Sequence, residues 1–379
     1  MKILLDVSAA IPPLSGVGRY AVELARRLPG QPGVDEIRYL RGGRVSSELE
    51  VGAAAPSSSW RKQVRRFLPY MLLAPYRRRR ARQLAGTLAA FDDHVFHSTN
   101  FSMPPVSGPS VVTIHDMSVF HLPEYHPRDR VNYLCEQISH SVERAHRLVT
   151  GSEFVRREIL DHFAIDPDRV VAIPLGVDAS FQPRSADTLA GTLSRLGLSA
   201  GGYLLNVGTI EPRKNLPGLL DAYRRLDAGI RNRFPLVIAG AYGWKGADTL
   251  DDIRRLEASG EVIYLDYVPE QDLPLLYAGA AAFCYFSFYE GFGLPVLESF
   301  ASDVPVVCAD IPALRELGGE DALFADPNDP LSMATALEQA LTDTGWRESA
   351  IARGRERAAA YTWDRTASLL VDLFTGIAR

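Results

Sequence analysis

The chain has 379 residues, of which 46% are hydrophobic and 23% are charged, and its formal net charge is -5 with a pI of about 5.9. This length exceeds one typical hydrophobic core, so two domains are expected, and the acidic balance gives no support for nucleic-acid binding. No apolar run reaches the roughly 18 residues that a membrane span needs. The three cysteines, Cys135, Cys284 and Cys308, form no closely spaced pair, which favours a reducing, cytoplasmic location.

The first residues predict a buried strand, a loop and a helix. The apolar run is short, is broken by Asp6 and stops at Pro12, so it fits a strand better than a signal peptide. The loop after it ends in Gly16-Val17-Gly18, and an amphipathic helix is expected from Arg19. Further strands of this half are expected within residues 94–99, 111–116, 147–152 and 170–177.

A strongly basic segment interrupts the first half. Its nine basic residues, with no acidic residue among them, are Arg61, Lys62, Arg65, Arg66, Arg77, Arg78, Arg79, Arg80 and Arg82. The apolar stretch "FLPYMLLAPY" lies between the two basic blocks. Arginines interleaved with aromatic residues are attracted to an anionic bilayer, by about 1 kcal/mol per charge near the surface. We expect this segment to contact a membrane surface, and a solvated helix face is the alternative.

The second half repeats the alternation of strands and helices. A strand over residues 203–207 precedes a loop and a helix after Asn215. Further strands are expected within residues 235–240, 262–268, 281–287 and 305–310. Short apolar runs that alternate with helices are typical of parallel sheets covered on both faces, so the fold class is α/β with two doubly wound, Rossmann-like domains. The expected domains are residues 1–185 and 186–361, and ligands of such sheets bind at the carboxyl ends of the strands, here in a central cleft.

The stretch "YEGFGLPVLE", residues 289–298, places two carboxylates around a glycine-rich turn. Pro295 suits the start of a helix, and the backbone N–H groups near Gly293 and Leu294 would then be available to a phosphate. Glu290 would precede this helix and Glu298 would lie in its first turn. The two acids could bind opposite ends of a ligand with a phosphate between them, such as a nucleotide-sugar. A capped helix with two surface acids is the alternative.

The stretch "VGTIEPRKN" places two cations after another strand. Arg213 and Lys214 follow a turn at Gly208. Cations at the carboxyl end of a strand can neutralise a diphosphate and stabilise it as a leaving group. Two solvated loop cations are the alternative.

These motifs, together with "SGVGRY", "IHD", "SEFVRREI", "LGVD" and "ASDVPVVCADIPALREL", resemble the retaining family 4 glycosyltransferases of the two-domain GT-B fold. The resemblance extends from about residue 1 to 375 and is weakest over residues 41–90. It is strongest to bacterial enzymes that build mannose- or rhamnose-containing surface polysaccharides, such as lipopolysaccharide, from GDP-sugars. It implies an acceptor-binding first domain, on which a C-terminal helix of about residues 362–379 packs, and a nucleotide-sugar-binding second domain.

The resemblance also implies roles for single residues. Glu298 would bind the ribose hydroxyls and Glu290 the donor sugar, while Arg213 and Lys214 would hold the diphosphate. His115 would lie near the donor sugar and shape the reaction centre, and a satisfied buried histidine is the alternative. The other donor contacts that we expect are Gly16, Gly18, Gly208, Phe292, Gly293, Leu294, Tyr267 and Val268.

The sequence departs from the commoner family pattern at one position. Many members have an arginine directly after the glycine of this strand, whereas here Thr209 follows Gly208 and the two cations are adjacent. The geometry of the cations is therefore harder to predict than that of the acids.

The expected reaction is metal-independent transfer of mannose from GDP-mannose to a saccharide or lipid-linked acceptor. The one Asp-x-Asp sequence, Asp166-Pro167-Asp168, is interpreted as a turn before a strand. Retention by front-face attack is the expected mechanism, in a protein peripheral to the inner face of the cell membrane. GDP-rhamnose or a UDP-sugar is the alternative donor. A sugar-nucleotide epimerase and a non-catalytic nucleotide-sugar-binding membrane protein are alternatives from other classes.

Overall fold

The structure is a computed structural model that describes residues 1–12, 14–49 and 84–378. The basic segment Arg61–Arg82 lies outside the described residues. The chain forms two compact units. Unit 1 comprises Met1–Phe120, Arg128–Leu175 and Trp363–Arg379, and unit 2 comprises His121–Pro127 and Gly176–Thr362.

Unit 1 is built on a seven-stranded sheet in the order β3-β2-β1-β4-β5-β6-β7. The strands are β1 Lys2–Asp6, β2 Glu36–Arg41, β3 Arg44–Ser46, β4 Val95–Ser98, β5 Ser110–Thr113, β6 Arg147–Thr150 and β7 Val170–Ala172. All neighbours are parallel except β2 and β3, which form an antiparallel edge pair. The helices are α1 Gly16–Arg27, α4 Ser118–His121, α5 Arg128–Arg144, α6 Glu153–Phe163 and α16 Trp363–Ile377.

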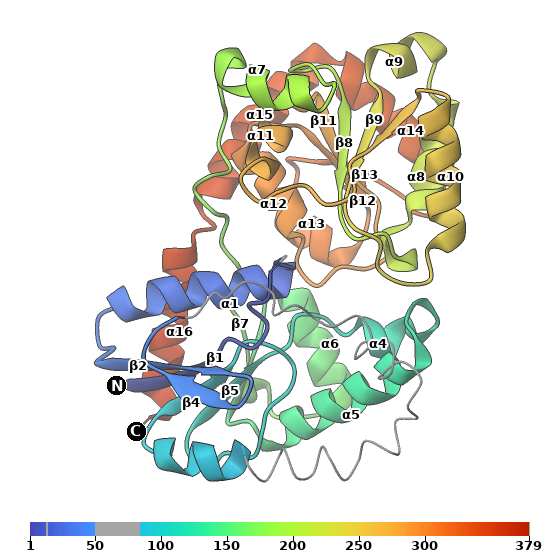
Figure 1. Ribbon diagram of the computed structural model, residues 1–379. Helices are drawn as coiled ribbons and strands as arrows, with labels where there is room; N and C mark the ends of the chain where they lie inside the picture. Colours follow the sequence, from blue (N-terminus) through green and yellow to red (C-terminus); the bar gives the residue numbers. More distant parts are fainter. Residues whose placement is uncertain (13, 50–83, 379) are drawn as a thin grey trace. The chain divides into compact units, whose positions relative to one another are not determined.

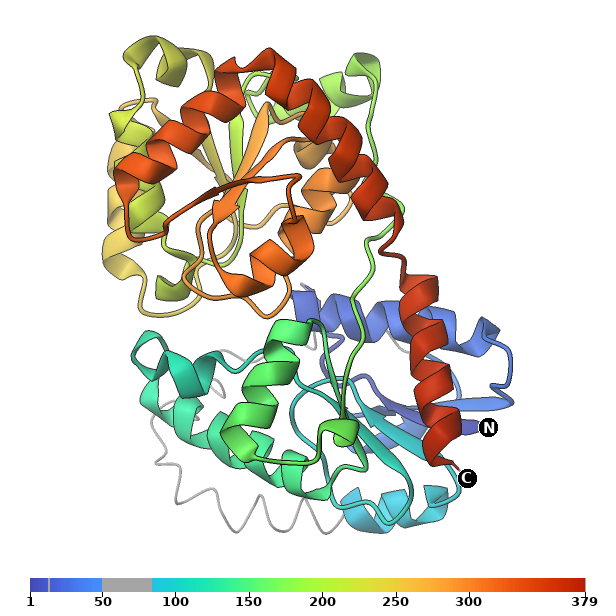
Figure 2. The ribbon, with the colours of Figure 1, turned by 180° about the vertical axis from the view of Figure 1, so that it is seen from behind.

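Helices cover both faces of this sheet (Figures 1 and 2). Helices α5 and α6 contribute apolar side chains such as Leu134, Ile138 and Ile159 to the core on one face. Helices α1 and α16 lie side by side in unit 1, where Tyr20 contacts Trp363 with ring centroids 6.0 Å apart. The last helix of the chain is therefore part of unit 1.

Unit 2 is built on a six-stranded, wholly parallel sheet in the order β10-β9-β8-β11-β12-β13. The strands are β8 Leu204–Val207, β9 Leu236–Ala239, β10 Val262–Tyr264, β11 Ala282–Tyr285, β12 Val306–Ala309 and β13 Leu323–Ala325. The helices are α7 Ala186–Arg195, α8 Leu216–Arg225, α9 Ala228–Arg233, α10 Ala247–Ala258, α11 Leu273–Ala278, α12 Leu294–Ala301, α13 Pro312–Gly318, α14 Pro330–Thr342 and α15 Thr344–Ala359.

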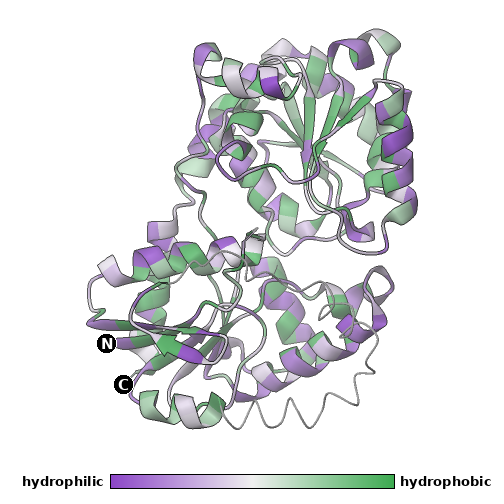
Figure 3. Cartoon of the chain, in the orientation of Figure 1, coloured by the Kyte–Doolittle hydropathy of each residue, from purple (hydrophilic) through white to green (hydrophobic). Residues whose placement is uncertain are grey.

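Alternate residues of each strand of unit 2 enter two separate cores, one on each face of the sheet. Leu204 packs with residues of α8, α10 and α14, whereas its neighbour Leu205 packs with residues of α7, α11, α12 and α13. Because both faces of this sheet are buried, its strands are mostly apolar, with Asn206 of β8 as a buried polar exception, and Figure 3 shows the strands of unit 2 largely in green. This confirms the predicted α/β class with two doubly wound parallel sheets.

The structure adds elements that the sequence did not predict. Strand β2 has the sequence "EIRYLR", in which charged residues interrupt the apolar ones, because this strand, second from the edge of the sheet, is only partly buried. Gly42 and Gly43 have φ angles of 59° and 91°, which allow the tight turn into β3. Helix α1 begins at Gly16 and not at Arg19, because the Ser15 hydroxyl caps it by accepting a hydrogen bond from the Gly18 N–H.

Among the described residues, no helix combines the length and the hydrophobicity that crossing a membrane requires.

Candidate functional site

The glycine-rich segment after β11 leads directly into α12. Strand β11 ends at Tyr285, before the expected Ser287, and α12 begins at Leu294 with Pro295 as its second residue. Gly293 caps the helix with a φ of 112°, and a Cβ atom there would lie 2.7 Å from Leu314 Cδ2. The cap makes no side-chain hydrogen bond, Pro295 has no N–H, and the Val296 N–H donates to the Gly293 carbonyl at 2.9 Å, so the Leu294 N–H is the first-turn amide suited to an anion.

Glu298 does not lie in the first turn of α12, so that prediction is wrong. It is the fifth residue of the helix, whose first turn contains no acidic residue. The reason is that Gly293 turns the chain early enough for the helix to start at Leu294. Glu298 is buried, with 6% of its surface exposed.

Glu290 forms the centre of a buried ion cluster. Its Oε1 lies 2.7 Å from Lys214 Nζ, and its Oε2 lies 3.1 Å from Arg213 Nη1. The side chains of both cations are 13% exposed and that of Glu290 is 9% exposed. Lys214 Nζ also donates a hydrogen bond to the Tyr285 hydroxyl at 2.5 Å. The structure thus brings together three predicted catalytic residues within unit 2.

A second acid, Glu211, completes this cluster, and the sequence analysis missed it. Its Oε1 lies 2.8 Å from Arg213 Nη2, and its side chain is only 3% exposed. The signal was present in "IEPRKN", since an acid two residues before an arginine can reach it across a turn. We call Glu211, Arg213, Lys214 and Glu290 the ion cluster.

Local structure places the two cations on a short turn. Pro212–Lys214 form one turn of 3₁₀ helix, and Asn215 follows in the left-handed conformation with a φ of 53°. The Asn215 side chain donates a hydrogen bond to the Pro327 carbonyl at 2.7 Å, which anchors the turn. The Phe288 N–H donates to the Arg213 carbonyl at 2.9 Å, so the turn is tied to the segment that carries Glu290.

Electrostatics keep Glu290 ionised. Burial alone raises the pKa of this carboxyl, but the charges of Lys214 and Arg213 outweigh burial and lower the pKa to about 2. Burial lowers the pKa of Lys214, and the Glu290 carboxylate opposes that effect. Burial and the nearby Glu290 charge raise the pKa of the Tyr285 hydroxyl, which therefore stays protonated.

The segment His121–Pro127, which belongs to unit 2, packs against Phe288 and Tyr289, the two residues before Glu290. The Tyr125 ring lies 5.7 Å from that of Phe288, and the His121 ring lies 6.3 Å from that of Tyr289. Trp244 Nε1 donates a hydrogen bond to the Tyr125 carbonyl at 2.9 Å. These aromatic contacts support the segment that carries Glu290, and no local sequence pattern signalled them.

The other donor contacts predicted in unit 2 are Gly208, Phe292, Tyr267 and Val268, and none of them belongs to the ion cluster. Gly208 directly follows β8, and a Cβ atom on Gly240 would lie 1.9 Å from the Gly208 carbonyl oxygen, so the two backbones approach closely. Phe292 contacts Tyr361, with ring centroids 6.0 Å apart. Tyr267 and Val268 follow β10, and Tyr267 is 51% exposed.

In unit 1, His115 follows β5 and is held from two sides. Its Nε2 lies 2.9 Å from the Thr99 carbonyl oxygen, which can only accept a hydrogen bond, so Nε2 carries the proton and Nδ1 of the neutral ring is an acceptor. The Tyr20 ring meets the imidazole edge-on at 5.0 Å. Burial lowers the pKa of His115, although the Thr99 carbonyl and Asp116 oppose this. The imidazole is therefore neutral at pH 7.

The two glycines predicted in the first unit lie in the first turn of α1. Gly16 is the first residue of the helix. A Cβ atom on Gly18 would lie 2.8 Å from the Ala9 carbonyl oxygen, so only glycine permits the loop after β1 to pass this close.

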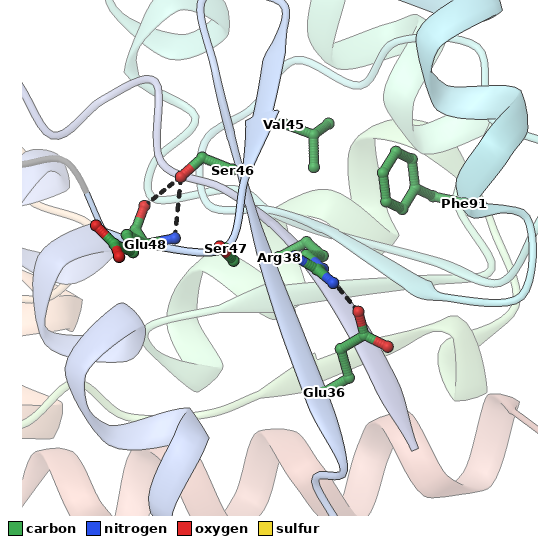
Figure 4. A pocket seen from close by; sticks show the side chains of 7 residues that line it. All are labelled: Glu36, Arg38, Val45, Ser46, Ser47, Glu48 and Phe91. Carbon is green, nitrogen blue, oxygen red and sulfur yellow. Dashed lines mark hydrogen bonds and ion pairs between the residues drawn. The ribbon is translucent and has the colours of Figure 1, made fainter.

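Unit 1 also contains a pocket, which Figure 4 shows from close by. It is lined by Glu36, Arg38, Val45, Ser46, Ser47, Glu48 and Phe91. Glu36 Oε1 accepts a hydrogen bond from Arg38 Nε at 2.6 Å, so these two lining charges are paired with each other. None of the predicted site residues lines this pocket.

The described part of the chain contains no group of three or more His, Cys, Asp or Glu side chains placed to hold a metal ion. The Asp166-Pro167-Asp168 sequence forms a capped turn before β7, because the Asp166 carboxylate accepts a hydrogen bond from the Asp168 N–H at 2.9 Å.

Comparisons with known proteins agree with this geometry. The family model described as "Glycosyltransferase Family 4" matches residues 14–181, and that described as "Glycosyl transferases group 1" matches residues 199–357. The O-antigen chain mannosyltransferase B of Escherichia coli is 37% identical over 379 residues, covering 99% of this chain and 99% of that protein. A D-inositol 3-phosphate glycosyltransferase of Salinispora arenicola is 32% identical over 247 residues, covering 62% of this chain and 55% of that protein.

Solved structures share the fold at low sequence identity. Sucrose-phosphate synthase from Thermosynechococcus elongatus aligns with a TM-score of 0.73 at 17% identity, covering 99% of this chain and 98% of that chain. WaaG, a glycosyltransferase involved in lipopolysaccharide biosynthesis, aligns with a TM-score of 0.71 at 14% identity, covering 99% of this chain and 100% of that chain. The chain is therefore a glycosyltransferase and belongs to family 4, with the two-domain GT-B fold.

Proposed function

We propose that the chain transfers mannose from GDP-mannose, with retention of anomeric configuration, to a saccharide or lipid-linked acceptor in bacterial surface polysaccharide synthesis. The observation that carries the choice of sugar and pathway is the full-length similarity to the O-antigen chain mannosyltransferase B of Escherichia coli. The buried ion cluster beside the start of α12 supports a nucleotide-sugar as the donor, since it places cations, amides and acids around one site.

In this proposal, each part of the site binds one part of the donor. The Lys214 ammonium has three N–H groups, and Glu290 and Tyr285 accept from two of them, so one N–H is left for the diphosphate. Arg213 adds a second positive charge, and the amides of Gly293 and Leu294 bind a phosphate oxygen. Phe292 provides a further backbone N–H, Glu298 binds the ribose, and Glu290 binds the hydroxyls of the sugar.

The remaining contacts are proposed from the loops. Gly208, Gly16 and Gly18 allow close approach of the backbone to the donor, and Tyr267 and Val268 form part of the base pocket. His115 offers the unprotonated Nδ1 as an acceptor for a hydroxyl of the donor sugar, because its Nε2 proton is already donated to Thr99.

The proposed mechanism is front-face attack. Glu290 is ion-paired through both oxygens, which makes it a poor covalent nucleophile. The acceptor hydroxyl attacks the anomeric carbon on the side from which the diphosphate leaves, and a phosphate oxygen takes the hydroxyl proton. Lys214 and the N-terminus of α12 stabilise the charge of the leaving group, as a divalent cation would do elsewhere.

The experiment that tests the donor is a thermal-shift titration with GDP, UDP, ADP and their sugar conjugates in the presence of EDTA. Stabilisation by GDP and GDP-mannose is expected, since a ligand at 100 times its Kd stabilises the folded state by about 2.7 kcal/mol. Stabilisation by UDP or GDP-rhamnose, and not by GDP-mannose, would identify a different donor from the one proposed. If the donor stabilised the protein only after a metal was added, the proposal that donor binding is metal-independent would be overturned.

The reaction itself is tested with purified protein, donor and a mannose-terminated acceptor, and the anomeric configuration of the product is read by NMR. Net inversion at the anomeric carbon would overturn the front-face mechanism. Conversion of the donor without acceptor would favour an epimerase, and donor binding without turnover would favour a non-catalytic binding protein.

We further propose that the basic segment Arg61–Arg82 holds the enzyme at the inner face of the cell membrane. The support is its sequence, which combines nine basic residues with aromatic ones and contains no acid. Changing Arg77, Arg78, Arg79 and Arg80 to Ser is expected to abolish cosedimentation with anionic vesicles, whereas the matched change to Lys is expected to preserve it. Unaltered cosedimentation of the Ser variant would remove the membrane proposal.

A further inference from the structure

Arg213 joins the turn after β8 to the segment that carries Glu290. Its Nη2 lies 2.8 Å from Glu211 Oε1 on its own turn. Its Nη1 donates to the Tyr289 carbonyl at 2.6 Å and lies 3.1 Å from Glu290 Oε2. The two terminal nitrogens of one planar guanidinium therefore contact two different acids, so the orientation of Arg213 links the positions of those acids.

Glu290 is fixed through both of its oxygens, by two different cations. Lys214 holds Oε1 at 2.7 Å, while Arg213 holds Oε2 at 3.1 Å. A carboxylate held at one oxygen can still rotate about that contact, whereas one held at both has a defined plane. Arg213 thus sets the plane of the Glu290 carboxylate.

Glu211 is costly to bury in its present state. Its side chain is 3% exposed, and its Oε2 has no hydrogen-bond partner among the described residues. A half-satisfied buried carboxylate lowers stability compared with a well-packed apolar side chain. Its contribution is therefore better explained by the geometry that it imposes on Arg213 than by stability.

We propose that Glu211 is a positioning residue, which acts through Arg213 to hold the Glu290 carboxylate in the plane that binds the donor sugar. This inference rests on the role proposed above for Glu290. Arg213 then orients Glu290 in addition to placing its positive charge near the diphosphate, and Lys214 is the side chain that directs an N–H toward the diphosphate.

The test compares the steady-state kinetics of Glu211→Gln, Glu211→Asp, Arg213→Gln and the double variant Glu211→Gln/Arg213→Gln. The control is Asp321→Asn, which removes another buried acid that pairs with arginines, Arg353 and Arg357, within the same unit. Both acid-to-amide changes remove the charge of a buried acid that pairs with arginine, so a comparable loss of melting temperature is expected. Only the change at Glu211 is expected to alter catalysis.

For Glu211→Gln, kcat is expected to fall by roughly 10-fold to 100-fold, because small misplacements of a group at the reaction centre cost up to about 100-fold. The KM for the donor is expected to stay within about 3-fold, and kcat of Asp321→Asn is expected to match the unchanged protein. The double variant should be no slower than Arg213→Gln alone, since Glu211 acts through Arg213. Glu211→Asp, which keeps the charge but shortens the reach, should be intermediate.

Two results would overturn the inference: a kcat of Glu211→Gln equal to that of Asp321→Asn, or losses that multiply in the double variant. If Glu211→Gln fails to fold, the same comparison is made with Glu211→Asp, whose unchanged kcat would likewise overturn it. If the unchanged protein transfers no sugar from any donor, the proposed function fails first and the inference fails with it. Transfer by the unchanged protein, with normal turnover in the Glu211 variants, would overturn the inference alone.

Discussion

Replacing Glu290 by Gln is expected to destabilise the folded chain by about 3 kcal/mol at pH 7. The pKa of this carboxyl is about 2 in the fold, compared with an ordinary value of 4.5. At about 1.36 kcal/mol per pKa unit, the difference corresponds to about 3 kcal/mol in favour of the ionised form. Glutamine has nearly the shape of the protonated carboxyl group, so the variant resembles the neutral state that the two cations disfavour.

The same linkage predicts how the difference depends on pH. The pKa is lowered by folding, so the stabilisation is fully present above pH 4.5 and is lost as the pH falls through about 2. The gap in unfolding free energy between the two proteins should therefore be roughly 1 kcal/mol smaller at pH 4 than at pH 7, because the variant has no carboxyl to titrate.

The measurement is urea unfolding of both proteins at pH 7 and pH 4, followed by circular dichroism and tryptophan fluorescence. The matched control is Glu338→Gln in α14, which makes the same chemical change at an exposed position of unit 2 and should alter stability by less than about 0.5 kcal/mol. A loss below about 1 kcal/mol for Glu290→Gln, or a gap that does not narrow at pH 4, would refute the electrostatic reasoning.

Lys214→Met should lower kcat by roughly 100-fold to 1,000-fold, because it removes the N–H proposed to stabilise the leaving group. Glu290 would keep Arg213 as its other cation, so urea unfolding should show a smaller loss of stability for Lys214→Met than for Glu290→Gln. Gly293→Ala should lower the free energy of unfolding by about 1–3 kcal/mol and weaken donor binding, since the φ of 112° and the 2.7 Å approach to Leu314 Cδ2 both oppose a Cβ; thermal unfolding with and without GDP checks both effects. Glu298→Gln should raise the KM for the donor about 10-fold with little change in kcat, and a donor that lacks the ribose hydroxyls should be insensitive to this change.

The parallel sheets were predictable because their strands are buried on both faces. Strands β8, β11 and β12 consist almost entirely of buried residues, so each reads as an apolar run between two helices. Strand β2 lies toward the edge of its sheet, and its charged residues mask the pattern. Strand β13, "LFA", was not predicted: it has three residues, and Asp321 and Asp326 lie close on either side of it, so no extended apolar run marks it.

The site was predictable where its chemistry is local in the sequence. The segment from Glu290 to Glu298 carries its own turn, helix start and acids. The contact between Arg213 and Glu290 depends on β8 pairing with β11, with Leu204 opposite Ala282, and no local pattern states which strands are neighbours. The role of Glu211 is hidden for the same reason, because its importance depends on what Arg213 contacts across the sheet.

The charges of the ion cluster add a constraint on how a diphosphate can bind. Its two acids and two cations sum to zero, so the cluster offers no net positive charge that would attract an anion from a distance. We infer that the diphosphate is held by directed donors, namely the remaining N–H of Lys214 and the amides at the start of α12. The acids then have a second use besides binding sugar and ribose: they hold two buried cations in place before the donor arrives. Preorganisation of this kind is what allows fixed N–H groups to stabilise a leaving group without a cost of rearrangement during the reaction.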